Sequence, residues 1–331
     1  MINAYIKNIS FYVPEKIVTN DDLSSMMDTS DEWISTRTGI KKRHSVGDTN
    51  LGPADLAVEA TEKLLKKLNI SKSEIDFVVF ATSTPDYAIP GAGTVFQHKM
   101  GLGKIGILDI RQGCSGFVYA LSVANQYIKA ETYKNILVIG AEVQTTQLDY
   151  DDQGRGTAII FGDGAAACLV KGTAENKGIL STHLHSDGEF IDELSTKYPS
   201  SKYKDIINNK NIEDREHHIY MNGREVFKHA VKRFPEVIME GLEHNNFNAD
   251  DLSLVIPHQA NYRITQAVQK KLGVSEDKVF SNIHKYGNTT AASVGIALSE
   301  ALDEGKIEDN DIIILAAFGA GFYWGSVVIR W

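Results

Sequence analysis

Short apolar runs alternate along the chain with segments of helical periodicity. In the segment that begins at residue 114, the apolar residues Phe117, Leu121, Ala124 and Ile128 recur at the spacing of one helix face. The pattern predicts strands at 76–82, 106–110, 135–142, 158–164 and 165–171, and helices at 53–69, 91–100 and 114–130. Unbroken apolar strands that alternate with helices predict an α/β fold, in which helices cover a mostly buried sheet.

The second half of the chain repeats this plan. Segment 251–259 is similar in kind to the strand at 76–82, and segment 278–302 matches 104–125 as a strand, a glycine-containing corner and a helix of small residues. We therefore predict two related halves, residues 1–174 and 175–331, packed tightly because no linker separates them. Cys114 and Asn288 occupy the same kind of corner in the two halves. The polar segment 186–218 is predicted to be a loop insertion.

One apolar run near the end of the chain resembles a membrane span. Residues 312–329 carry no charge, and this length is at the lower edge of what crosses a bilayer. Three glycines interrupt the run and no basic flank anchors it, so it predicts two buried strands joined by a turn. The N-terminus lacks the basic and apolar regions of a signal peptide, so we expect no membrane partner.

The overall composition is that of an ordinary globular protein. Hydrophobic residues make up 43% of the 331 residues and charged residues 23%. The formal net charge of −9 argues against broad nucleic-acid binding. Two cysteines cannot form a disulfide framework, which favours a reducing, cytoplasmic location.

Cys114 is the first candidate for chemistry. It lies among the small residues Gly113, Ser115 and Gly116, between a predicted strand and a predicted helix. The start of a helix lowers the pKa of a thiol, and small neighbours leave the sulfur accessible. The pattern is typical of an activated nucleophile, although a small buried apolar residue remains the alternative. Cys168, inside an apolar strand, is expected to be such a buried residue.

Two further polar positions interrupt apolar surroundings. His258 follows the strand in "VIPHQANYRI", and Asn288 lies at the corner in "YGNTTAAS". Either residue alone is weak evidence, but with Cys114 they mark three corners at strand ends. No site for a metal or a dinucleotide is predicted, because "GLGKIG" opens a strand rather than a helix, and the pairs His183/His185 and His217/His218 lack further ligands at metal spacing.

These motifs give the chain a clear family resemblance over its whole length. It resembles β-ketoacyl-acyl-carrier-protein synthase III, a condensing enzyme. The resemblance is carried by "DTSDEWISTRTGI" (28–40), "CSGF" (114–117), "GRGTAIIFGDGAAA" (154–167), "STHLHSDG" (181–188), "VIPHQANYRI" (255–264), "YGNTTAAS" (286–293) and "AFGAGFYWGS" (317–326). It implies the thiolase fold: two pseudo-duplicated halves in a five-layered αβαβα arrangement, and a homodimer.

The resemblance also implies a decarboxylating Claisen condensation that initiates fatty-acid synthesis. Cys114 would take the acyl group from a short acyl-CoA, with acetyl-CoA as the leading candidate. His258 and Asn288 would stabilise the enolate formed when malonyl-acyl-carrier protein loses CO₂. Backbone N–H groups of Cys114 and Ala320 would form the oxyanion hole. No metal or organic cofactor is implied, since coenzyme A enters only as part of the substrate.

Other matched positions concern the ligands. The resemblance implies that Trp33 and Arg155 sandwich the adenine of coenzyme A, that Arg37 meets its phosphate with Thr29 nearby, and that Phe227 lines the pantetheine channel. It assigns the docking of the acidic carrier protein to a basic patch formed by Lys228, Arg263, Lys270 and Lys271.

The chain departs from the family pattern next to the nucleophile. Gln112 and Gly113 replace two alanines, and Ala320 replaces the middle one of three glycines. These changes leave open a related ketosynthase of secondary metabolism that uses longer or branched acyl groups. A biosynthetic thiolase is disfavoured because "AAFGAGF" lacks a second cysteine, and a non-catalytic partner subunit is disfavoured by the presence of all three polar corner residues.

Overall fold

The computed structural model describes residues 2–202 and 204–331 and contains two large sheets. In the first sheet the strand order is β1-β7-β6-β4-β5. Its strands are β1 (Asn3–Tyr12), β7 (Gly164–Thr173), β6 (Asn135–Glu142), β4 (Phe77–Ala81) and β5 (Gly106–Ile110). Strands β6 and β4 and the edge strand β5 run parallel, so their carboxyl ends lie at the same edge of the sheet.

The second sheet has the order β11-β12-β13-β8. Its strands are β11 (Leu254–Pro257), β12 (Ile312–Gly319), β13 (Tyr323–Arg330) and β8 (Gly178–Ser186). Beyond β11, a parallel bridge joins Val255 to Val279, at the position that β5 holds beside β4. The two sheets therefore have the same strand order, which confirms the repeated plan seen in the sequence.

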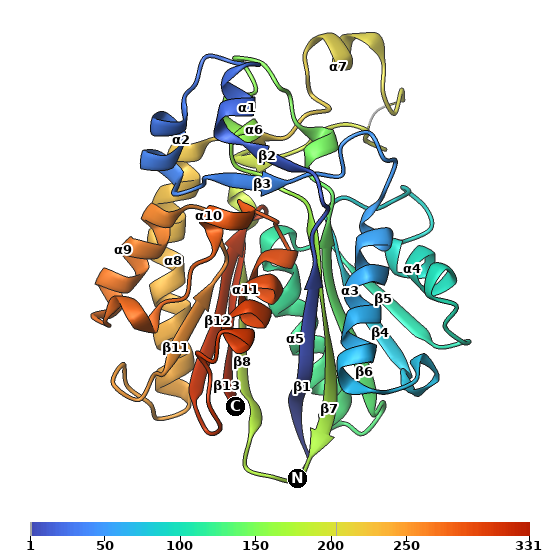
Figure 1. Ribbon diagram of the computed structural model, residues 1–331, viewed down its shortest axis with the longest axis vertical. Coiled ribbons are helices and arrows are strands. Elements are labelled where there is room, and N and C mark those ends of the chain that lie inside the picture. Colours follow the sequence, from blue (N-terminus) through green and yellow to red (C-terminus); the bar gives the residue numbers. More distant parts are fainter. Residues whose placement is uncertain (1, 203) are drawn as a thin grey trace.

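Helices separate and cover the two sheets (Figure 1). Helices α5 (Gly116–Lys129) and α11 (Ala292–Asp303) lie between the sheets and contact strands of both. Helices α3 (Pro53–Leu68) and α4 (Ala92–Met100) cover the outer face of the first sheet. Helices α8 (Gly223–His244) and α9 (Tyr262–Leu272) lie on the outer side of the second. The predicted five layers are present in the order helix, sheet, helix, sheet, helix.

The central helices bring the two glycine-containing corners together. The apolar face of α5 that the sequence predicted is buried, including Phe117, Leu121 and Ala124. A Cβ added at Gly116 would lie 3.0 Å from Cβ of Ala81 and 3.2 Å from Cβ of Ala291. Glycine is therefore required where α5 starts, because the end of β4 and the start of α11 both approach it closely.

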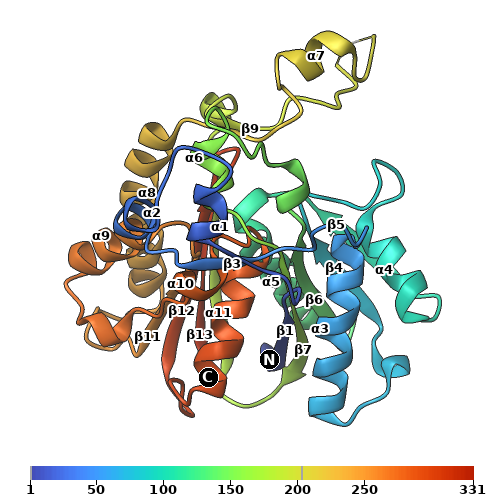
Figure 2. The same cartoon turned by 45° about the horizontal axis from the view of Figure 1, so that its top comes forward.

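Shorter elements lie above the ends of the layers, with α7 standing away from the rest of the molecule (Figures 1 and 2). The short helices are α1 (Asn20–Ser24), α2 (Asp31–Thr38), α6 (Arg155–Ala158), α7 (Asn209–Glu213) and α10 (Ile283–Tyr286). The short strands are β2 (Ile17–Thr19), β3 (Lys42–His44), β9 (Leu194–Ser195) and β10 (Tyr220–Met221). Single 3-10 turns are η1 (Lys72–Glu74), η2 (Gly113–Ser115), η3 (Thr145–Gln147), η4 (Gly188–Phe190) and η5 (Glu276–Lys278).

Two sequence predictions need correction. The apolar segment 158–164 is not a strand: it continues from α6 into a turn, and only Phe161 forms an isolated bridge, to Asn288. Its apolar residues pack against Leu23, Ile34 and Ile40 rather than within a sheet. The insertion 186–218 is not wholly irregular, because it contains β9 and α7.

The apolar run near the end of the chain forms the antiparallel pair β12 and β13, as predicted. Within the described ranges, every helix falls short of the length or apolarity needed to cross a bilayer.

Candidate active site

Cys114, His258 and Asn288 line one cavity of about 230 Å³. Cys114 lies in the η2 turn that leads from β5 into α5, on the first half of the chain. His258 follows β11 directly, and Asn288 precedes α11, both on the second half. The three predicted residues thus come from separate strand ends that the central helices bring together.

The backbone around Cys114 surrounds its sulfur with N–H groups. Hydrogen bonds from the backbone N–H groups of Cys114 itself and of Ala320 favour the thiolate. Burial and the negative charge of Glu142 outweigh them and raise the pKa of the thiol to about 12. The expectation that the helix start lowers this pKa is therefore wrong, because desolvation is the larger effect.

Glu142 is a buried carboxyl group that the sequence analysis did not single out. It accepts hydrogen bonds from Ser83 N at 3.0 Å, Ser83 Oγ at 2.8 Å and Thr84 Oγ1 at 2.7 Å. Burial raises its pKa, although the backbone N–H of Ala291 is among the groups that stabilise its charge. The signal in the sequence was a glutamate at the end of an otherwise apolar strand, "NILVIGAE".

His258 is held as a neutral ring. It is almost fully buried, and burial lowers its pKa to about 3. Its Nδ1 lies 2.5 Å from Oγ of Ser293, near the start of α11. The neighbouring Gln259 fixes the chain after β11, since its amide donates to the carbonyl of Pro257 and accepts from Asn282 N.

Asn288 is fixed through both its backbone and its side chain. Its N–H donates to the carbonyl of Ile160 at 2.9 Å, and its carbonyl accepts from Gly162 N at 3.0 Å. Its side-chain Oδ1 accepts from Thr290 N at 2.8 Å. Because the amide oxygen is engaged in the turn, the Nδ2 donor is the free end of this cavity-lining side chain.

Three of the residues predicted to bind coenzyme A, namely Trp33, Arg37 and Phe227, line the same cavity. Arg155 does not line it but lies against Trp33. The guanidinium carbons of Arg37 and Arg155 lie 4.4 Å and 5.0 Å from the Trp33 ring centre. Arg155 also donates to the carbonyl of Asp28. The adjacent Thr29 does not line the cavity, and its Oγ1 is buried without a partner among the described residues.

The residues predicted to dock the carrier protein lie on α8 and α9. Lys228 extends from α8 and pairs with Glu225 at 3.0 Å, and its side chain is mostly exposed. Lys270 and Lys271 are exposed in the last turn of α9. Arg263 differs from the others, because its guanidinium donates to the carbonyl of Thr36 and joins α9 to α2.

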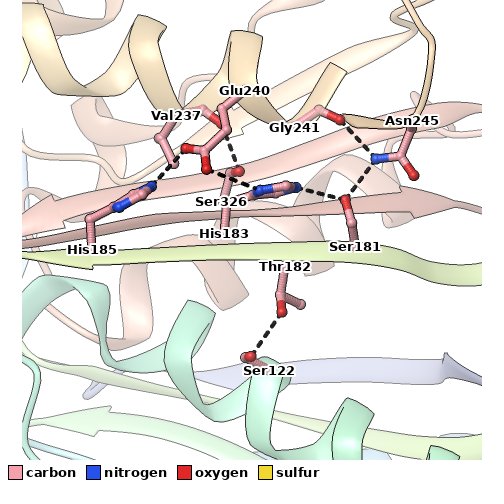
Figure 3. A network of polar contacts seen from close by, with 10 residues as sticks. All are labelled: Ser122, Ser181, Thr182, His183, His185, Val237, Glu240, Gly241, Asn245 and Ser326. Atoms are coloured by element: carbon pink, nitrogen blue, oxygen red, sulfur yellow. Dashed lines mark hydrogen bonds and ion pairs between the residues drawn. The ribbon is translucent and has the colours of Figure 1, made fainter. Parts of the chain in front are cut away.

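The histidine pair on β8 belongs to a structural network (Figure 3). His185 Nε2 lies 2.7 Å from Glu240, which belongs to α8, and His183 Nδ1 lies 3.3 Å from the same carboxylate. Ser181 and Asn245 continue the chain of hydrogen bonds from the other side of His183. Among residues 2–202 and 204–331, no three His, Cys, Asp or Glu side chains are placed to hold a metal ion.

Comparisons with known proteins give the family of the chain. The family described as "3-Oxoacyl-[acyl-carrier-protein (ACP)] synthase III" matches residues 108–188, and its C-terminal counterpart matches residues 242–331. The chain is 42% identical over 326 residues to the β-ketoacyl-[acyl-carrier-protein] synthase III of Fusobacterium nucleatum, covering 98% of both chains. It is 43% identical to that of Caldanaerobacter subterraneus, covering 100% of this chain and 98% of the relative.

A solved structure extends the agreement to the fold. The chain is similar to β-ketoacyl-[acyl carrier protein] synthase III from Thermus thermophilus, with a TM-score of 0.91, 38% identity and 99% of each chain covered. The thiolase fold implied by the motifs is confirmed. The chain belongs to the β-ketoacyl-[acyl-carrier-protein] synthase III family of condensing enzymes.

Proposed function

We propose that the protein catalyses the decarboxylating Claisen condensation of a short acyl-CoA with malonyl-acyl-carrier protein, the step that initiates fatty-acid synthesis. The observation that carries the proposal is the meeting of Cys114, His258 and Asn288 in one cavity. A thiol, a neutral imidazole and a carboxamide are the groups that this chemistry needs. Acetyl-CoA is the leading candidate for the acyl donor.

In the first half-reaction, Cys114 Sγ attacks the thioester carbonyl of the acyl-CoA. A bond forms between Sγ and the carbonyl carbon, the bond to the coenzyme A sulfur breaks, and the thiol proton leaves with the departing thiol. The carbonyl oxygen becomes negative on the way. We assign the stabilisation of that charge to the N–H groups of Cys114 and Ala320, and their hydrogen bonds to the sulfur support this assignment.

In the second half-reaction, the malonyl thioester loses CO₂ and leaves an enolate. Its oxygen carries the negative charge, and the two neutral donors His258 Nε2–H and Asn288 Nδ2–H would hold it. By analogy with other oxyanion holes, each donor is worth ~3 kcal/mol of the barrier. The enolate carbon then attacks the acyl-Cys114 carbonyl and forms the new carbon–carbon bond. The thioester bond to Sγ breaks, the β-ketoacyl product leaves on the carrier protein, and the released thiolate takes up a proton from water. Two donors supply what this step needs, so we propose no metal or organic cofactor.

The ligands would reach this centre from the side of α2 and α8. Arg37 and Arg155 both lie over the Trp33 ring, and Arg155 is too close to the ring for a base to fit between them. An adenine would stack on Trp33 in the place of one guanidinium, with Arg155 moved outward to cover its other face. Thr29 is the neighbour of Asp28, which holds Arg155, and Phe227 lines the cavity between this cluster and the nucleophile. On a chain of net charge −9, the basic residues Lys228, Arg263, Lys270 and Lys271 offer an acidic carrier protein a local positive surface.

We also propose a homodimer that works in the cytoplasm. β5 is the last strand of its sheet, so one edge is unpaired in this chain. Beside it, Tyr87 and Ile89 expose 60% and 89% of their surface, which is costly for apolar side chains unless a partner covers them. Both cysteines are free, which suits a reducing environment such as the cytoplasm.

A panel of acyl-CoA thioesters tests the function. The protein is incubated with each thioester, the mass added to Cys114 is measured, and malonyl-acyl-carrier protein is then added for product analysis. We expect an acetyl adduct, and then a four-carbon β-ketoacyl product. Cys114→Ala should abolish the adduct, while His258→Ala and Asn288→Ala should keep the adduct and lose the product.

The same panel separates the proposal from its alternative. A ketosynthase of secondary metabolism would prefer longer or branched thioesters over acetyl-CoA. The relatives that share 42% and 43% identity with this chain bear the name of the initiating synthase, which supports the first reading. A protein that forms no adduct with any thioester would contradict both.

A further inference from the structure

Ser293 is the residue that the chemistry above leaves without a role. It lies at the second position of α11, is 2% exposed, and has its Oγ 2.5 Å from His258 Nδ1. A second contact reaches the same oxygen: the backbone N–H of Gln259 donates to it at 3.4 Å. Within the described residues, the Ser293 side chain has no other hydrogen-bond partner.

The two hydrogen bonds of Ser293 Oγ determine where the protons of this cluster lie. The Gln259 N–H always donates, so it takes one acceptor site of the Ser293 hydroxyl. The hydroxyl proton must itself find an acceptor, because an unsatisfied buried donor costs roughly 1–3 kcal/mol. Among the residues that the structure describes, the acceptor in reach is His258 Nδ1, and it can accept only when it carries no proton. With the proton on Nδ1 instead, two donors would converge on Oγ and the hydroxyl proton would have no partner.

We propose that Ser293 is a positioning residue that selects the tautomer of His258. The hydroxyl donates to Nδ1, which leaves the single ring proton on Nε2, the nitrogen available to the cavity. The effect of this tautomer on catalysis rests on the proposed function. In that function the enolate oxygen needs a hydrogen-bond donor at Nε2 of His258, and a lone pair there would repel it.

The neutral state of His258 makes this choice decisive. Burial keeps the ring unprotonated at neutral pH, so only one of its nitrogens carries a proton. A free imidazole would populate both tautomers, and a ring with the proton on Nδ1 would present a lone pair to the enolate oxygen.

The same turn sets the second donor as well. The backbone N–H of Thr290 holds the side-chain oxygen of Asn288. Three residues further along the chain, Ser293 contacts the His258 ring. Segment 288–293 therefore orients both of the groups assigned to the enolate, one by a backbone donor and one by a side-chain donor.

Nitrogen-15 NMR of histidine-labelled protein tests the proposal without any substrate. The signals of His258, assigned by comparison with His258→Ala, should show a protonated Nε2 and an unprotonated Nδ1 in the wild type. In Ser293→Ala we expect a mixture of both tautomers, with at least ~10% of the Nδ1–H form. A wild-type ring with its proton on Nδ1 would overturn the proposal, whatever the enzyme's activity.

Kinetics of the separate half-reactions give the functional arm. Ser293→Ala should form the acyl-Cys114 adduct at a rate within about twofold of wild type, while kcat for condensation falls at least ~10-fold and KM for the malonyl carrier changes less than about twofold. Ser293→Thr, which keeps the hydroxyl, should regain at least about a third of kcat. Ser299→Ala, which removes another buried hydroxyl of α11, is the matched control and should keep full activity.

The outcomes separate the two proposals. Equal losses in both half-reactions, or the same loss in Ser299→Ala, would mean that Ser293 only supports the helix. If the wild type forms no adduct with any thioester, the proposed function fails, while the NMR experiment still decides the tautomer.

Discussion

Gly319 lies so close to Cys114 that a Cβ atom added to it would stand 2.7 Å from Cys114 Cβ and 3.1 Å from Sγ. The end of β12 in the second half thus contacts Cys114 of the first half through a glycine, which has no side chain. The next residue, Ala320, contributes the N–H that faces the same sulfur. Ala320 is not among the residues with positive φ, so an alanine fits there without strain.

Gly319→Ala should therefore damage the site directly. The added methyl group has to displace Cys114 or β12, and overpacking of this kind costs typically about 1–3 kcal/mol. We expect the rate of adduct formation to fall at least ~10-fold, with a lower melting temperature. Gly103→Ala is the matched control, because its new Cβ would meet no atom within 4 Å. A Gly319→Ala enzyme that acylates at the wild-type rate would contradict the contact.

The pH dependence of thiol alkylation should report the environment of Cys114. Its pKa is raised to about 12, so the thiolate fraction is small at pH 7 and rises with pH. Glu142 contributes through its negative charge, and Glu142→Gln should move the alkylation profile to lower pH. Mass spectrometry after iodoacetamide treatment measures the profile, and the fully buried Cys168 serves as the unreactive reference. A shift to higher pH in the variant would refute the electrostatic assignment.

Trp33→Ala should separate recognition of the coenzyme from chemistry. Loss of the ring removes the face that Arg37 and Arg155 cover, and cation–π contacts are worth about 0.5–2 kcal/mol. We expect KM for acetyl-CoA to rise ~10-fold while kcat is kept. An acetyl-pantetheine thioester, which lacks the adenosine part, should react at the same rate with the wild type and with Trp33→Ala. Equal losses with both thioesters would instead indicate a role for Trp33 nearer the thiol.

Reversal of charge on α9 should weaken only the second half-reaction. In Lys270→Glu/Lys271→Glu the positive surface becomes negative, so KM for the malonyl carrier should rise ~10-fold or more at low salt. Acylation by acetyl-CoA should be unchanged. Lys66→Glu/Lys67→Glu alters a lysine pair at the end of α3 and is the matched control. An unchanged KM in the α9 variant would place the docking surface elsewhere.

The β8 network should make stability depend on pH. Burial lowers the pKa of His183 in the folded protein, although Glu240 favours its charged form. In the unfolded chain the ring binds a proton below about pH 6.5, so the unfolded state gains protons first and folding weakens as the pH falls. Urea unfolding at pH 7.5 and pH 5 should show the advantage of wild type over His183→Gln shrinking at the lower pH. An advantage that grows on acidification would reverse the assigned direction.

Much of the fold followed from apolar patterning, because buried strands and amphipathic helices leave strong periodic signals. The strands at 106–110 and 135–142 have the predicted bounds. The strand predicted at 158–164 was wrong because the segment is apolar for a different reason. Its side chains pack against α1 and α2 rather than within a sheet. The division at residue 174 falls between β7 and β8 but, as a statement about domains, it stays a prediction.

The site was predictable where a residue type is unusual in its place, as for Cys114, His258 and Asn288. Their roles, and those of the ligand-binding residues, stay predictions. The raised pKa of Cys114 was not predictable, since it depends on burial and on Glu142, whose position relative to the thiol comes from the packing of the strands. The contact between Ser293 and His258 joins residues 35 positions apart, and no local pattern indicates it.

The shared strand order of the two sheets has a consequence for how the proposed chemistry is divided. Two halves of the same architecture could each hold a complete site, whereas the proposed mechanism needs a part from each. In that mechanism the first half supplies the thiol and the second half supplies the two enolate donors. Neither half could complete the condensation alone.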